Sequence, residues 1–129
     1  MPESNATTRG VRVRVKSQYH PERSRPAENE WFFSYAITIT NEEKVTVRLL
    51  TRHWIITDSN GHVQEIRGPG VVGQQPVLAT GQSFEYTSFC PLKTSFGTMH
   101  GTYQMVTDNG ETFDAEIAPF QLGQPYSIN

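Results

Sequence analysis

The segment 68–76, GPGVVGQQP, contains three glycines, Gly68, Gly70 and Gly73, at a spacing that could allow backbone amides to contact a phosphate. Arg67 directly before it could add a positive charge. A dinucleotide-binding loop needs a helix after its glycines, but Pro76 prevents a helix from starting there. No lysine follows Gly73, so the segment is not a Walker loop either. One hypothesis is therefore a small anion, meaning phosphate, pyrophosphate or a nucleotide, held by turn amides without a helix dipole.

The same segment carries two adjacent aliphatic residues, Val71 and Val72. Paired valines are an unusual use of a loop surface, so exposed valines would indicate a contact surface for a protein partner. A purely structural alternative is a loop whose glycines permit positive φ and close packing. The candidate partner- or anion-binding residues are Arg67, Gly68, Pro69, Gly70, Val71, Val72, Gly73 and Gln74.

Other residues with catalytic or metal-binding chemistry are scattered along the chain. The histidines at 20, 53, 62 and 100 form no ligand pair at a recognised spacing, and the acids show no calcium-loop order. Cys90 precedes Pro91 and is typical of a small buried hydrophobe rather than an activated thiolate. No serine lies in a nucleophile elbow. The sequence thus predicts no catalytic residue, no metal site and no cofactor, and indicates a protein that is not an enzyme.

Arg52, His53 and Trp54 occupy consecutive positions of an expected strand. Arg52 and Trp54 would share one face, with His53 on the other. The arginine could stack on the indole and present its guanidinium to a partner. We favour the alternative, in which Trp54 fills the core and Arg52 lies at its margin.

The alternating segment 11–16, VRVRVK, predicts a strand with three valines facing the core and three bases facing out. Its basic face carries no aromatic residue, so nucleic acid is not a favoured partner. A solvated edge strand protected by charge explains the bases as well.

At 129 residues, with 13 acidic and 11 basic residues, the chain has the size and composition of one globular domain. Further strands are expected at 31–40, 45–58, 62–67, 77–78, 83–89, 98–107 and 111–117, and the first two of these are expected to pair as a hairpin. Seven to eight strands predict an all-β, antiparallel two-sheet sandwich. Residues 1–9 are expected to be a flexible tail, 10–123 a single domain, and 124–129 a second tail.

Nothing in the sequence indicates export or membrane insertion. The N-terminus lacks the apolar core of a signal peptide, and no stretch of 18 apolar residues occurs. Cys90 is the only cysteine, so no disulfide framework is possible. A cytoplasmic location without membrane contact is expected.

Five motifs follow one another within residues 9–123: Arg52-His53-Trp54, the segment 68–76, Phe84-x-Tyr86-x-Ser88, Gly97-x-Met99-x-Gly101-x-Tyr103, and Pro119-Phe120-x-Leu122. With these motifs the chain resembles the ApaG family. The resemblance implies an immunoglobulin/fibronectin type III-like sandwich and a link to cobalt and magnesium resistance or efflux. Similar domains in eukaryotic proteins look like interaction modules. We therefore expect a non-enzymatic binding or adaptor module for an unidentified protein partner, with a phosphate- or pyrophosphate-containing ligand as the alternative.

Overall fold

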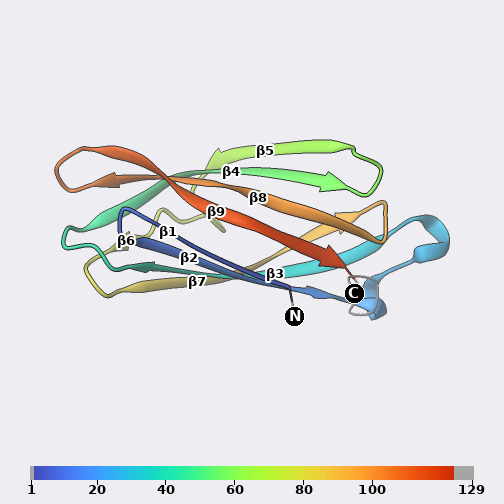
Figure 1. Ribbon diagram of the computed structural model, residues 1–129. Coiled ribbons are helices and arrows are strands. Elements are labelled where there is room, and N and C mark those ends of the chain that lie inside the picture. Colours follow the sequence, from blue (N-terminus) through green and yellow to red (C-terminus); the bar gives the residue numbers. More distant parts are fainter. Residues whose placement is uncertain (1, 124–129) are drawn as a thin grey trace.

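The computed structural model describes residues 2–123, which form nine strands and two short 3-10 helices (Figure 1). One sheet has the order β1-β2-β3-β7, with bounds β1 Glu3–Thr8, β2 Val11–Tyr19, β3 Trp31–Asn41 and β7 Ser83–Leu92. The other has the order β5-β4-β8-β9, with bounds β4 Val47–Asp58, β5 Val63–Pro69, β8 Phe96–Thr107 and β9 Thr112–Gly123. The short strand β6 (Val77–Leu78) pairs with β4 in that second sheet. All pairings are antiparallel, which confirms the predicted all-β sandwich.

The core lies between the two sheets and is filled by the inward positions of each strand. Alternation predicted Val11, Val13 and Val15 as core positions, and the structure confirms them in β2. The buried residues of β3, β8 and β9 include Phe33, Tyr35, Ile37, Ile39, Tyr103, Met105, Ala115 and Ile117. Trp54 also lies in the core, 3% exposed, with its ring against Tyr35, Tyr103 and Phe120. The prediction that Trp54 fills the core is therefore confirmed.

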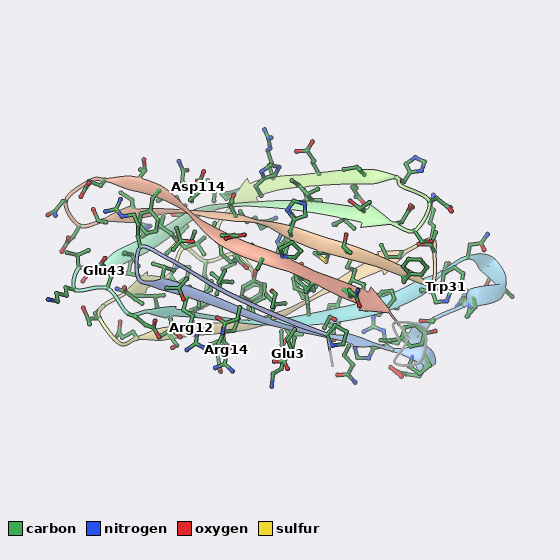
Figure 2. All side chains as sticks on the ribbon, in the orientation of Figure 1. Glu3, Arg12, Arg14, Trp31, Glu43 and Asp114 are labelled. Atoms are coloured by element: carbon green, nitrogen blue, oxygen red, sulfur yellow. The ribbon has the colours of Figure 1, made fainter. Side chains whose placement is uncertain are left out.

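The N-terminal segment differs from the expected flexible tail, because Glu3–Thr8 forms β1. It pairs along its whole length with β2, from Glu3 opposite Lys16 to Thr8 opposite Val11. Its side chains are mostly small and polar and show no apolar alternation, so its order depends on the backbone pairing with β2. As a result β2 is an internal strand, and the prediction of a charge-protected edge there is wrong. Figure 2 shows Arg12 and Arg14 pointing away from the opposite sheet.

The expected hairpin of segments 31–40 and 45–58 is also wrong, because β3 and β4 lie in different sheets. Asn41 ends β3 fully buried, and its side-chain amide donates to the carbonyl oxygens of Val45 and Leu78, each at 2.9 Å. These bonds satisfy a buried polar group where the chain crosses between sheets. The crossover leaves β3 free to pair with β7 instead.

The two long sides of the sandwich differ. On one side β1 and β2 approach β9: the Ser17 hydroxyl donates to the Gln121 carbonyl at 2.6 Å, and the Glu116 amide to Thr8 Oγ1 at 3.0 Å. On the other side lie β5 and β7, each the terminal strand of its sheet. That side is the open one.

The 3-10 helices η1 (Pro21–Arg23) and η2 (Pro26–Glu28) belong to the connection between β2 and β3. None of the helices in residues 2–123 has the length and apolar composition needed to cross a bilayer. The predicted C-terminal tail, 124–129, lies outside the described residues.

Candidate functional site

The candidate segment divides into a strand end and a tight turn. Gly68 and Pro69 are the last residues of β5, so the strand ends two residues later than the sequence indicated. Val71 and Gln74 then exchange two backbone hydrogen bonds, with N–O distances of 2.8 and 2.9 Å. The connection is thus a small hairpin turn and not an extended loop.

The two valines of this turn have different environments. Val71 is 1% exposed and belongs to the core, whereas Val72 is 55% exposed. Val72 and Gly73 have φ values of 43° and 80°, as in a type I′ turn. A β-branched residue at positive φ is strained. Of the expected two-valine contact surface, only Val72 is available.

The strain at Val72 makes a testable prediction. Val72→Asn is expected to raise the free energy of unfolding by about 1 kcal/mol, because asparagine tolerates the left-handed conformation that Val72 adopts at the first central position of a type I′ turn. Urea unfolding measures the change. The control is Val63→Asn, at an exposed strand position, which should not stabilise the protein. A neutral or destabilising Val72→Asn would contradict the strain.

The backbone of the turn offers oxygens more than amides. The Gly70 amide donates to the Leu50 carbonyl at 2.8 Å, and the Val71 amide donates to the Gln74 carbonyl at 2.8 Å. The carbonyls of Pro69 and Gly70 both accept from Arg52 Nη1, each at 3.0 Å. The segment therefore binds a cationic side chain of its own protein. Anion binding by this segment stays a prediction. The Gly70 and Val71 amides are not available to an anion, because both already donate to backbone carbonyls.

The glycines of the segment make room for these contacts. A Cβ on Gly68 would lie 3.0 Å from Arg52 Nη2, so the missing side chain leaves space for the guanidinium. A Cβ on Gly70 would lie 2.3 Å from the Gln74 carbonyl oxygen, and Gly70 has a φ of 62°. Close packing accounts for both positions, as the structural alternative proposed.

Arg67 does not face the turn. Its side chain is 73% exposed and lies 3.5 Å from Glu65, which also contacts His53 Nε2 at 2.8 Å. The hydrogen bond to His53 is the main cause that lowers the pKa of Glu65. His53 and Arg67 are register partners on the outer face of the sheet, opposite to the face of Trp54. The sequence had grouped Arg67 with the glycines, and of these only Gly68 lines a cavity together with Arg67, one that Arg52 and His53 also line.

The open side of the sandwich contains a cleft made of two adjoining cavities. The first, here called the inner pocket, has a volume of about 270 Å³ and lies between β5 and β7, over Tyr35, Arg52, Trp54 and Met99. The second, the outer pocket, has a volume of about 770 Å³ and extends to η2 and the β4–β5 turn. The two share the lining residues Ile56, Gln64 and Pro91. We take this cleft as the candidate functional site.

The inner pocket combines one cation with neutral hydroxyls. The hydroxyls in its lining are those of Tyr35 and Ser88. The Tyr86 and Tyr103 hydroxyls, outside the lining, are hydrogen-bonded to each other across the sheets. Burial is the main cause that raises the pKa of Tyr35, of Tyr86 and, most strongly, of Tyr103, while the charge of Arg52 acts in the opposite direction. Within residues 2–123, no carboxylate forms an ion pair with Arg52. The pocket therefore carries an uncompensated positive charge.

Sequence reasoning placed Arg52 at the margin of the core, which is correct, but missed its role in the cleft. The sequence did contain a signal for this position: Arg52 lies two residues before Trp54 on the same strand, so both side chains point inward. Ser88 and Tyr35 were missed as well, because they become neighbours only through the register of β3 and β7.

Cys90 also lines the inner pocket. It is 4% exposed, and burial raises the pKa of its thiol to about 12. The prediction of a small buried hydrophobe is confirmed. A thiol with this pKa is almost entirely protonated at neutral pH and is a poor nucleophile.

The histidines serve as hydrogen-bonding groups where their partners are defined. His20 Nε2 lies 2.7 Å from Ser34 Oγ, and His53 contacts Glu65. In the described chain, residues 2–123, no three His, Cys, Asp or Glu side chains converge as metal ligands.

Comparison with known proteins gives consistent matches. The model of the ApaG domain family matches residues 21–107. "Protein ApaG" of Anaeromyxobacter dehalogenans is 52% identical over 126 residues, covering 98% of this chain and 99% of that protein. The protein of the same name from Rhodopseudomonas palustris is 52% identical over 120 residues, covering 93% and 92%. A solved structure from Bordetella pertussis, described as an ApaA protein, is 50% identical with a TM-score of 0.87, covering 89% of this chain and 94% of its own.

Proposed function

This chain belongs to the ApaG domain family, and on that premise we propose that it is a non-enzymatic binding module that receives an extended protein segment along β5. The observation that carries the proposal is the cleft between β5 and β7, flanked by the terminal strands of both sheets. The neutral Tyr35 phenol and Cys90 thiol that line the inner pocket support binding rather than nucleophilic catalysis.

The backbone of β5 is suited to strand addition. Gly70 donates to Leu50, and the register pairs Gly68 with Arg52 and Ile66 with Trp54. Because antiparallel pairs alternate, the amides of Val63, Glu65 and Arg67 point to the free side of the strand. An extended segment could pair with them and continue the sheet across the cleft.

The rim of the cleft offers apolar contact. Ile66 is 36% exposed on β5, and Phe89 is 50% exposed on β7. Phe89 stacks with Phe32 at 5.5 Å between ring centroids, and Arg23 lies over both rings. Side chains of an added strand that point inward would meet Ile66, while Phe89 lies at the rim, in the outward phase of β7.

The charged residues that line the cleft indicate which charges a bound segment would carry. The outer pocket is lined by three carboxylates, those of Glu28, Glu30 and Asp58, against one lysine, Lys93. The inner pocket has Arg52. The inward positions of β5 at these two ends are Gln64 and Gly68, so a bound strand would carry a basic and an acidic residue about four positions apart on its inward face. We therefore commit to a partner segment of that chemistry.

The test uses a phage-displayed library of random 12-residue peptides selected against the purified protein. Selected peptides should show the paired charges and shift the amide signals of β5 and β7 in NMR spectra. Arg67→Pro should weaken their binding at least about tenfold, because proline removes an amide from the free side of β5. Arg67→Ala is the matched control, since it loses the same side chain but keeps the amide, and it should bind within about twofold of wild type.

Two results would contradict the proposal. One is a selection that yields no peptide directed to β5 or the cleft. The other is a set of peptides whose affinity is the same for Arg67→Pro and Arg67→Ala.

A further inference from the structure

We propose that the inner pocket binds a carboxylate carried on a small apolar group, and that Arg52 recognises its charge. The inference deepens the proposed function, on which it rests for the partner, because it names the group that a bound segment presents at the Gly68 end of β5. Its test uses free small molecules, so that the two proposals can fail separately.

Arg52 is oriented by the protein but not neutralised by it. Nη1 donates to the carbonyls of Pro69 and Gly70, which fixes the guanidinium above Gly68. In residues 2–123, Ser4 Oγ is the only fully buried side-chain polar atom without a partner. The N–H groups of Arg52 that make no bond to the protein are therefore accessible from the pocket or from solvent. A guanidinium fixed in this way presents its remaining donors in the planar arrangement that suits a carboxylate.

Neutral hydroxyls add donors without adding negative charge. Tyr35 and Ser88 are register partners on β3 and β7, and both line the pocket with Arg52. Because burial raises the pKa of Tyr35, its phenol stays protonated at neutral pH and can donate. An anion bound here meets a cation and hydroxyl donors.

The walls and the size of the pocket define the rest of the ligand. Apolar residues form most of its lining, namely Trp54, Ile56, Ile66, Phe89, Cys90, Pro91 and Met99. Its volume of about 270 Å³ is at the lower limit for ligand pockets, about 300 Å³. One aromatic ring or branched side chain is therefore accommodated. A nucleotide carries more charge than a single arginine balances and more bulk than this pocket holds.

The experiment is an NMR titration of the full-length labelled protein with benzoate and, separately, with its neutral analogue benzamide. Benzoate should give saturable shifts at Tyr35, Arg52, Ser88 and the Trp54 indole, with a Kd on the order of 1 mM. Benzamide should bind at least about tenfold more weakly, since it cannot form a charge-assisted bond with the guanidinium. This comparison needs no variant and is independent of any effect on folding.

Two variants then assign the charge. Arg52→Gln should weaken benzoate at least about tenfold, whereas Arg67→Gln, on the outer face, should leave it within about twofold. Equal binding of benzoate and benzamide would overturn the inference. So would loss of binding in Arg67→Gln with retention in Arg52→Gln.

A second pair of ligands distinguishes the source of the carboxylate. N-acetylphenylalanine mimics the C-terminal residue of a protein segment. N-acetylphenylalaninamide, the second ligand of the pair, has the same side chain but lacks the carboxylate charge. Tighter binding of this acid than of benzoate indicates a segment terminus, and the reverse indicates a free aromatic acid. Benzoate binding to Arg67→Pro should equal that to wild type, so a failure of strand addition leaves this result unaffected.

Discussion

Gly101→Ala is expected to lower the free energy of unfolding by at least about 4 kcal/mol, which is a large fraction of the total stability of a domain. Gly101 lies in β8 opposite Trp54 of β4, where the β8–β9 register shifts. A Cβ placed there would lie 1.9 Å from the His53 carbonyl oxygen and 3.2 Å from Trp54 Cα. Both contacts involve backbone, so relief requires β4 to move away from the centre of its sheet. That movement would displace Trp54 from the core and Arg52 from its carbonyls.

The control for this effect is Gly73→Ala. Gly73 has a φ of 80° but nothing within 4 Å of its Cβ position, so only the conformational cost of about 1 kcal/mol applies. Urea unfolding followed by circular dichroism compares the two variants with wild type. If Gly101→Ala loses no more stability than Gly73→Ala, the close approach of β8 to β4 is wrong.

The second large effect is loss of stability in alkali. The pKa values of Tyr35, Tyr86 and Tyr103 are raised in the folded state, mainly by burial. Above the ordinary tyrosine pKa of about 10, the unfolded chain therefore releases protons that the folded protein retains. Fewer protons bound to the unfolded state mean that stability falls as pH rises, by about 1.4 kcal/mol per pH unit for each tyrosine that is still protonated. All of this stability is present below pH 10.

The measurement is urea unfolding between pH 8 and pH 11. Cys90→Ala provides the background, because the raised pKa of the thiol, about 12, acts in the same direction. Adding Tyr86→Phe to this background should reduce the slope above pH 10 by about 1.4 kcal/mol per pH unit. An unchanged slope would show that Tyr86 ionises equally readily in the folded and unfolded states.

The sequence predicted the strands better than their arrangement. A strand with one buried face alternates apolar and polar residues, as segment 11–16 does, so such a strand can be assigned from its own residues alone. The pairing of β3 and β4 was wrong because the alternative is decided by Asn41, whose partners lie at positions 45 and 78. The strand β1 was missed because its residues carry no apolar signal and depend on β2 for order.

The candidate site was predicted only in part. The segment 68–76 drew attention through its glycines, and it does adjoin the cleft. Gly68, however, accommodates Arg52 from another strand, a relation that spacing along the chain does not reveal. Arg67 illustrates the same limit, since adjacency in sequence placed it beside the turn while strand alternation turns its side chain to the opposite face.

Pro69 sets the length of what β5 can recognise. It follows Val63, Glu65 and Arg67 on the free side of the strand, and it has no amide to donate. Hydrogen bonding to an added strand therefore ends at Pro69, and this end fixes the register of the added strand on β5. The edge thus offers about six residues for pairing before the amide is missing. The same proline that limits the ligand also limits how far a second copy of the protein could pair along this edge.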